Sequence, residues 1–334
     1  MSNKQYRFAL FGFVLLILTN PVYAESKKFL FPVGCTYGED CWAVNYVDVD
    51  PKDGRQDFKC NQKTYDGHKG TDFALGSIIQ MQEGVDVFAA AQGKVLRVRD
   101  GENDALKTPD EMKDLKERKK ECGNGILVDH GDGLQTIYCH LKKGSIIAEV
   151  GDHVSAGETI AQVGQSGMAE FPHLHFGVIW EGGIVDPYTG ALNVAGCNAV
   201  KESMWHIGLP MKYEPVAIFD GGFRSTVPDF EAIKRGEGNP STLSLKSAAF
   251  VFWVGFYNVE KDDVIDLVIL DPDGQEFIRQ QKIVQKNRAR QYYYTGRKIG
   301  HVQLKTGVYK GVSTLKRTGV DGVLREESFI VDVR

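Results

Sequence analysis

Apolar and polar side chains alternate in short runs along most of this 334-residue chain, and turn-forming residues separate the runs. Between residues 72 and 187, such runs predict β-strands that are half or fully buried. The expected strands are Val85–Ala91, Lys94–Arg99, Gly125–His130, Gln135–Leu141, Thr159–Val163 and Leu174–Trp180. The Gly- and Asp-rich residues 129–133 are typical of a hairpin loop between two of them. We therefore expect a mostly β protein with a twisted antiparallel sheet in this region.

A second series of alternating runs follows residue 241. Its expected strands are Ala249–Tyr257, Val264–Leu270, Phe277–Ile283, Gln291–Tyr294, His301–Leu304 and Phe329–Val333. Short strands separated by turns, with no helical pattern, are typical of an immunoglobulin-like β-sandwich. We expect residues 218–334 to form this accessory domain, which would position a substrate or a partner rather than react. Residues 200–217, which include Pro210 and Pro215, are the expected linker.

Two other segments differ from the strand pattern. Residues 100–121 contain fourteen charged side chains among twenty-two, and Pro109 is followed by two acidic residues, as at the start of a helix. We expect a short exposed helix there, inserted into a domain of residues 65–199 as a solvated decoration. Residues 25–64 are rich in Gly, Asp and Lys and contain three cysteines. They predict an irregular leader.

The first 24 residues have the features of a secretory signal peptide. Lys4 and Arg7 precede the apolar run Phe8–Leu18, and Val22 and Ala24 supply small side chains at the two positions that a signal peptidase reads, which places cleavage after Ala24. This run is shorter than the roughly 20 residues of a membrane-spanning helix, and no later apolar stretch is long enough. We expect export, to the periplasm or the medium, and no integral membrane span in the mature chain.

The net charge argues against a nucleic-acid partner. The chain contains 40 basic and 44 acidic residues, and the signal peptide accounts for two of the basic ones and none of the acidic ones, so the net charge falls from −4 to −6. Proteins that bind nucleic acids are expected to present a clustered basic face instead.

The chain has six cysteines, none of them after residue 197: Cys35, Cys41, Cys60, Cys122, Cys139 and Cys197. An even number in an exported chain favours disulfides, although six cysteines allow fifteen pairings. Counting outward from the hairpin loop at 129–133 brings Cys122 and Cys139 level on neighbouring strands, so we expect a bridge between them. We further expect Cys41–Cys60, which leaves Cys35 for Cys197. The alternative for Cys139 is a buried, reduced side chain.

Three short segments contain the side chains with metal-site chemistry. His173 and His175 are two residues apart in an expected strand, so their imidazoles share one face. His140 lies in another expected strand with apolar neighbours, where an imidazole needs a polar partner. His68 and Asp72 add a nitrogen and an oxygen from a glycine-containing segment. Two histidines and one carboxylate would leave a tetrahedral zinc ion with one open position, which is the catalytic arrangement.

These segments resemble the lysostaphin-type, LytM-like zinc endopeptidases of peptidoglycan. The motifs of that family are His-x-x-x-Asp, Tyr-x-His-Leu and His-x-His, in this order. Here they are His68 to Asp72, Tyr138 to Leu141 and His173 to His175. Residues 123–131 and 154–160 resemble the family segments that precede the second and third motifs. The resemblance covers about residues 65 to 190.

The resemblance implies that His68, Asp72 and His175 bind one Zn²⁺ ion, and that His140 and His173 stay free for catalysis. One free imidazole would act on the water that zinc activates, and the other would stabilise the oxyanion. Which histidine has which role stays open. Two features depart from the family. Gly177 stands where many relatives have an acid, and the tyrosine that several relatives place before the first motif has no secure match, Tyr65 being nearest.

The function that the resemblance implies is that of an exported zinc metalloendopeptidase that hydrolyses peptide cross-links of bacterial peptidoglycan. Its substrates would be stem or cross-bridge peptides, because relatives cut either glycine-containing bridges or D-amino-acid cross-links. The alternative is a non-catalytic wall-binding or amidase-activating relative, of the kind that keeps the fold and loses metal ligands. All five motif positions are intact here, which favours the enzyme.

Overall fold

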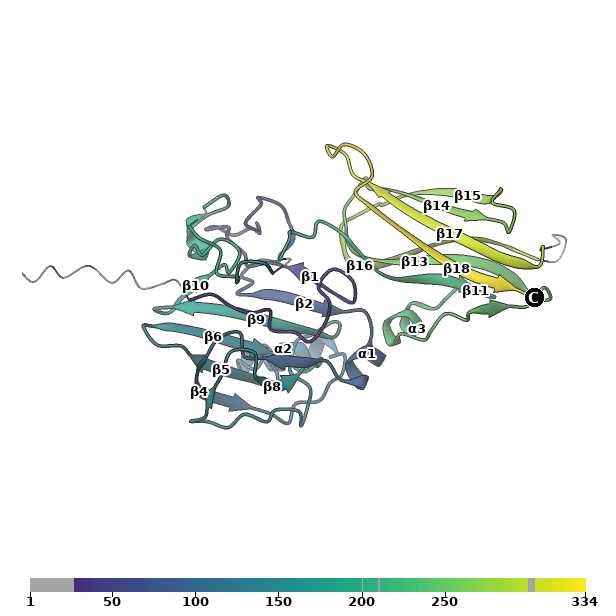
Figure 1. Ribbon diagram of the computed structural model, residues 1–334. Coiled ribbons are helices and arrows are strands. Elements are labelled where there is room, and N and C mark those ends of the chain that lie inside the picture. Colours follow the sequence, from purple (N-terminus) through teal and green to yellow (C-terminus); the bar gives the residue numbers. More distant parts are fainter. Residues whose placement is uncertain (1–26, 200, 210, 300–303) are drawn as a thin grey trace, which may run out of the picture.

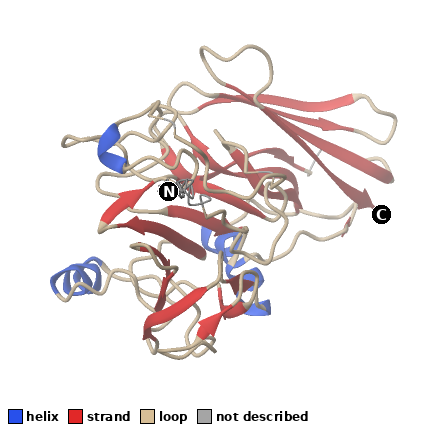
Figure 2. Cartoon of the chain, turned by 60° about the vertical axis from the view of Figure 1, so that its left-hand side comes forward, coloured by secondary structure: helices blue, strands red, loops and turns tan. Residues whose placement is uncertain are grey.

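The structure is a computed structural model that describes residues 27–199, 201–209, 211–299 and 304–334. Strands make up most of the regular structure and the helices are short (Figure 2), so the expectation of a mostly β protein is confirmed. The expected signal peptide lies outside the described residues, as does most of the expected strand His301–Leu304. In the described ranges, no helix has the length and apolar character that crossing a membrane requires.

An eight-stranded sheet, antiparallel throughout, forms the body of the amino-terminal half (Figure 1). Its order is β1-β2-β9-β6-β5-β4-β7, and β10 pairs with β9. The strands are β1 (Cys41–Asn45), β2 (Thr71–Leu75), β4 (Gly93–Arg99), β5 (Gly125–Asp129), β6 (Leu134–Cys139), β7 (His153–Val154), β9 (His173–Trp180) and β10 (Gly183–Val185). A separate two-stranded sheet pairs β3 (Asp86–Phe88) with β8 (Thr159–Gln162). All six strands predicted in this region are present, with their ends shifted by no more than three residues.

Helix α2 (Pro109–Glu117) lies in the charged insertion, as predicted. The Thr108 side chain caps it, and the Glu111 carboxylate accepts the Thr108 N–H, so that the two contacts form a capping box.

The leader, residues 25–64, is not entirely irregular, which differs from the prediction. It contributes β1, an edge strand that pairs with β2. Helix α1 (Ile78–Glu83) and the short 3₁₀ turn Asn193–Ala195 also lie outside the prediction.

One face of strand β9 packs into the core, and its other face carries polar side chains. Leu174, Phe176 and Val178 are fully buried in the main core of this half. His173 and His175 alternate with them and therefore point to the opposite face. The same alternation that forms the strand thus fixes the side on which the histidines lie.

The carboxy-terminal half consists of two further sheets, which appear green to yellow in Figure 1. One has the order β11-β13-β16 and the other β12-β18-β17-β14-β15. The strands are β11 (Ala217–Arg224), β12 (Thr242–Leu243), β13 (Ala249–Val259), β14 (Val264–Leu270), β15 (Glu276–Ile283), β16 (Arg288–Lys298), β17 (Gly307–Lys316) and β18 (Arg325–Val333). One apolar cluster takes side chains from both sheets, among them Phe252, Leu267 and Val331. The immunoglobulin-like topology itself stays a prediction. Helix α3 (Phe230–Arg235) was not expected.

Three disulfides join the six cysteines, and one of the three expected pairings is confirmed. Cys122 and Cys139 are bridged, with Cα atoms 4.9 Å apart. The other two expectations are wrong, since the bridges are Cys35–Cys41 and Cys60–Cys197. The chain turns back just after Cys35, where the N–H of Gly38 donates to the Cys41 carbonyl, and this local turn brings the first pair together. The loop at Cys60 packs against residue 198, which donates its N–H to the Phe58 carbonyl.

Candidate metal centre

Pairing of β2 with β9 brings two of the predicted ligands together. Asp72 is directly opposite His175 in this register, and opposite residues of neighbouring strands point to the same face. Asp72 Oδ1 lies 2.9 Å from His175 Nδ1. His68, four residues before Asp72, places Nε2 3.0 Å from each of these atoms. The structure therefore brings together the three residues that the motifs predicted as a ligand set, which could hold a metal ion.

The chemistry of the three donor atoms fits zinc. Zinc accepts imidazole nitrogen and carboxylate oxygen at about 2.0–2.2 Å, and tetrahedral bonds of that length place ligand atoms about 3.4 Å apart. The observed separations of 2.9–3.0 Å are slightly shorter, so a small outward relaxation would admit the ion. His68 donates Nδ1–H to the Tyr46 carbonyl at 2.7 Å, which leaves a lone pair on Nε2 facing the Asp72 carboxylate. The His68 lone pair and the Asp72 oxygen repel each other at 3.0 Å, and a cation bound between them would remove this repulsion.

The leader supplies the groups that orient two of these ligands. Tyr46 follows β1 and accepts the hydrogen bond from His68, while Asn45, in β1, donates Nδ2–H to Asp72 Oδ2 at 2.9 Å. Such outer contacts fix the tautomer and the direction of metal-binding side chains. Neither residue was predicted, because the leader showed no strand pattern and a backbone carbonyl leaves no trace in residue identity.

Two glycines allow close packing around the strand that carries His175, and one of them, Gly70, makes room for the His175 ring. A Cβ atom at Gly70 would lie 2.6 Å from His175 Nε2, and one at Gly177 would lie 2.8 Å from Ile137 Cγ2 and 3.1 Å from the Lys69 carbonyl oxygen. The glycine at residue 177, where the resemblance led us to expect an acid, therefore has a steric reason. Any side chain at residue 177 would collide with β6 and with the segment before β2.

His140 and His173 complete the cluster. Each donates Nδ1–H to a main-chain carbonyl, His140 to Ser166 at 2.7 Å and His173 to Phe171 at 2.8 Å. In both rings Nε2 is then left with a lone pair. The two ring centroids are 4.6 Å apart, and His173 Nε2 lies 3.7 Å from Asp72 Oδ1. All five predicted site residues thus lie on one face of the sheet.

The backbone at His140 differs from the expectation of a regular strand. Strand β6 ends at Cys139, and His140 has a φ of 61°. This left-handed conformation is uncommon for a residue with a side chain and persists only where neighbours impose it. Here the His140 N–H donates to the Cys122 carbonyl, and Cys122 is bridged to Cys139. The disulfide and the end of the charged insertion therefore determine where this imidazole points.

Electrostatics set the protonation states of the cluster. Burial would raise the pKa of Asp72, but the His68 and His173 imidazoles hold the pKa of its carboxyl well below the usual range. Burial, reinforced by His173 and His175, holds the pKa of His140 well below its ordinary value. Burial also lowers the pKa of His175, partly offset by its hydrogen bond to Asp72. At neutral pH the carboxylate is ionised and these two imidazoles are neutral, as metal ligands and proton acceptors must be.

Two further residues near the motifs have different surroundings. His130 uses both ring nitrogens inside the fold, with Nδ1 2.7 Å from the Gln92 carbonyl and Nε2 2.8 Å from Thr136 Oγ1, in keeping with a structural role. Tyr65 is about half exposed, with its ring centroid 4.3 Å from that of His68. It therefore flanks the cluster on the solvent side.

The antiparallel sheet thus carries a two-histidine, one-carboxylate cluster with two further imidazoles beside it. Residues 66–187, which contain all five cluster residues, match the model of Peptidase family M23. This part of the chain is a peptidase family M23 domain of the lysostaphin type, which confirms the resemblance seen in the motifs.

Curated and solved proteins show the same similarity over part of the chain. DD-carboxypeptidase/endopeptidase Mpg of Neisseria meningitidis is 32% identical over 113 residues, which are 34% of this chain and 23% of that protein. Peptidoglycan DD-endopeptidase ShyB of Vibrio cholerae is 30% identical over 128 residues, which are 38% of this chain and 24% of that protein. The chain thus spans about a quarter of the length of these relatives. The catalytic domain of lysostaphin from Staphylococcus simulans is 23% identical, with a TM-score of 0.26 and coverage of 43% of this chain and 85% of that one.

Proposed function

We propose that this chain is an exported zinc metalloendopeptidase that hydrolyses peptide cross-links of bacterial peptidoglycan. One observation carries the proposal. Three donor atoms of His68, Asp72 and His175 converge to within 3.0 Å, and the imidazole rings of His140 and His173 lie beside them. The family M23 domain and relatives named as peptidoglycan DD-endopeptidases support the substrate class.

In this proposal His68, Asp72 and His175 would hold the ion. Bound zinc supplies Lewis acidity and lowers the pKa of a bound water to about 7. His140 is neutral because burial and its neighbours lower its pKa, so its Nε2 accepts a proton from the nucleophile. His173 presents Nε2 to the same space, and in its protonated form it would donate to the oxyanion of the scissile carbonyl. The carbonyls of Ser166 and Phe171 hold the two rings in place, and the Ser166 carbonyl keeps neutral His140 in the tautomer with a lone pair on Nε2.

Export and domain organisation belong to the same proposal. Residues 1–24 would direct secretion to the periplasm or the medium, where three disulfides are stable. Residues 25–64 would be the leader, 65–199 the peptidase domain, 200–217 the linker and 218–334 the accessory domain.

Substitutions that separate metal binding from turnover test the site. We expect His68→Ala, Asp72→Ala and His175→Ala to lose both zinc and hydrolysis, and His140→Ala and His173→Ala to retain zinc and lose turnover. His153→Ala is the matched control, because His153 is exposed and outside the cluster. Zinc per chain is measured after dialysis. Hydrolysis is followed by mass spectrometry of fragments released from purified peptidoglycan, with and without a chelator.

The two measurements also distinguish the enzyme from a non-catalytic relative. Stoichiometric zinc without any released peptide would contradict the proposed activity while leaving the metal site in place. Wild-type turnover in His140→Ala or His173→Ala would remove that residue from the mechanism.

A further inference from the structure

The carboxy-terminal half packs against the catalytic sheet through an apolar cluster shared by both halves. None of its nine buried members is more than 7% exposed. Four come from the amino-terminal half and five from the other: Trp42, Val44, Ala74 and Phe171, then Ala217, Phe219, Ile233, Trp253 and Tyr257. An apolar contact of this kind fixes the two halves relative to each other, because separating them would expose large aromatic side chains to water.

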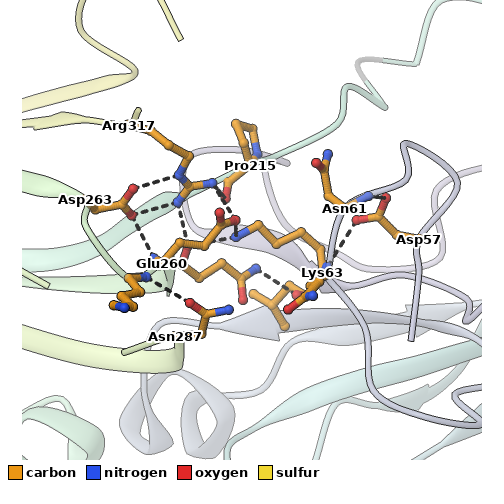
Figure 3. A network of polar contacts seen from close by, with 12 residues as sticks. Asp57, Asn61, Lys63, Pro215, Glu260, Asp263, Asn287 and Arg317 are labelled. Carbon is orange, nitrogen blue, oxygen red and sulfur yellow. Dashed lines mark hydrogen bonds and ion pairs between the residues drawn. The ribbon is translucent and has the colours of Figure 1, made fainter. Parts of the chain in front are cut away.

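A polar network closes the same junction at its edge (Figure 3). Lys63 Nζ lies 2.7 Å from Glu260 Oε1 and donates to the Asn258 carbonyl at 2.9 Å. Arg317 binds Asp263 with two nitrogens, each at 2.8 Å, and reaches Glu260 with a third. Breaking the contact across the junction is costly, since the buried Lys63 ammonium would be left without a partner. The junction is therefore a fixed interface.

Tyr257, on β13, lies where this interface meets the segment before His173. Its hydroxyl donates to the Leu75 carbonyl at 2.8 Å, and the Leu75 N–H donates to the Pro172 carbonyl at 3.0 Å. The ring centroid of Tyr257 is 5.5 Å from that of Phe171. One fully buried side chain thus supports both the end of β2 and the residues that lead into β9.

Phe171 connects this support to the cluster. Its carbonyl accepts Nδ1–H of His173 at 2.8 Å, and its ring centroid is 5.1 Å from the His173 ring. The position of Phe171 therefore sets both the tautomer and the direction of the His173 imidazole. Among the described residues, the Phe171 carbonyl is the hydrogen-bond partner of His173 Nδ1, and no side chain bonds this atom.

We propose that Tyr257 of the carboxy-terminal half is a positioning residue for His173, acting through Phe171, so that this half completes the catalytic site. The role of His173 in turnover rests on the proposed function. Removing the Tyr257 ring would leave space into which Phe171 relaxes, and its carbonyl would carry the imidazole with it. A misplacement of about 1 Å at a reacting group costs about a hundredfold in rate.

The test uses the zinc-loaded full chain and a soluble cross-linked peptidoglycan peptide. We expect Tyr257→Ala to lower kcat by roughly ten- to a hundredfold, with KM and zinc content unchanged. Tyr257→Phe keeps the ring and should restore most of kcat. Tyr309 provides the matched control, because it is equally buried but packs on Phe250 and Phe277 inside the sandwich. Tyr309→Ala should lower thermal stability and leave kcat unchanged. If Tyr257→Ala does not fold, Tyr257→Leu replaces it.

A second readout does not depend on activity. In protein labelled with ¹⁵N-histidine, the Nδ1–H resonance of His173 should shift in Tyr257→Ala and not in Tyr309→Ala. A wild-type protein that releases no peptide would overturn the proposed function, and the resonance would still test the positioning. Wild-type kcat together with an unshifted resonance in Tyr257→Ala would overturn the positioning role. An equal loss of kcat in Tyr309→Ala would do the same, because it would show a general effect of stability.

Discussion

Replacing Gly70 by alanine should displace His175 and weaken zinc binding. The new Cβ atom would lie 2.6 Å from His175 Nε2, 2.7 Å from His175 Cε1 and 2.7 Å from the Phe176 carbonyl oxygen. Ordinary carbon contacts begin near 3.5 Å, so the ring has to move by roughly 0.9 Å. The Phe176 carbonyl belongs to the backbone of β9, which is paired with β2 at Thr71, so the strand has little freedom to retreat.

This displacement is large compared with what a metal site tolerates. Metal–ligand distances are held within about 0.2 Å of their preferred values, so a ring moved by roughly 0.9 Å no longer serves as a ligand. Even the loss of an outer contact weakens metal binding by about 10- to 100-fold. For the loss of His175 itself we therefore expect a reduction in zinc affinity of at least about 100-fold.

Competition with a chromogenic chelator measures the zinc affinity, and circular dichroism confirms that each variant is folded. Gly67→Ala is the control three residues earlier. A Cβ atom there would meet nothing within 4 Å, but the φ of +73° disfavours a side chain, so we expect full zinc binding and a loss of stability of about 1–2 kcal/mol. Wild-type zinc affinity in Gly70→Ala would refute the steric argument and with it the placement of His175 in the ligand set.

Two other predictions concern the supports of the site and the pH dependence of stability. Replacing Cys122 and Cys139 together by serine should lower the free energy of unfolding by about 3 kcal/mol and reduce turnover without loss of zinc, because the Cys122 carbonyl accepts the His140 N–H. The corresponding double variant of Cys35 and Cys41 should keep full turnover. A larger loss of turnover in the Cys35 and Cys41 variant would contradict this reasoning. Burial raises the pKa of Asp186 to about 7, so the folded state holds a proton that the unfolded state releases near pH 4, and stability falls as the pH rises from about 4 to 7. In urea unfolding, the free energy of unfolding of the wild type should therefore fall by about 3 kcal/mol more than that of Asp186→Asn between pH 5 and pH 8. If the free energies of the two proteins change equally with pH, Asp186 is not responsible.

The motifs predicted the contents of the cluster but not its supports. His68, Asp72, His140, His173 and His175 were all identified, because metal and proton chemistry require particular side chains at particular spacings. Three of them, His68, His140 and His173, donate hydrogen bonds to main-chain carbonyls, namely those of Tyr46, Ser166 and Phe171. Every residue has a carbonyl, so residue identity contains no signal for these partners.

The disulfide pairings could likewise be predicted only where both cysteines belong to one hairpin. The Cys122–Cys139 bridge followed from counting along one hairpin, where the register of neighbouring strands is determined locally. Cys60 and Cys197 are 137 residues apart, and their proximity depends on how the leader packs against the end of the peptidase domain. The short Cys35–Cys41 bridge closes a turn at Gly38 that the sequence pattern did not reveal.

By itself the sequence determined the mostly β fold, most of the strands, the charged helix and the five cluster residues, since alternation, capping and motif spacing act over a few residues at a time. Three features could be seen only in the tertiary structure. They are the pairing of Asp72 with His175 across β2 and β9, the left-handed backbone at His140, and the packing of Tyr257 against Phe171. The first and third join segments that are distant along the chain, and the second depends on the hydrogen bond from the His140 N–H to the Cys122 carbonyl. Such contacts form only when the complete core excludes water, and the free energy that holds them comes from that shared burial and not from the residues near each site.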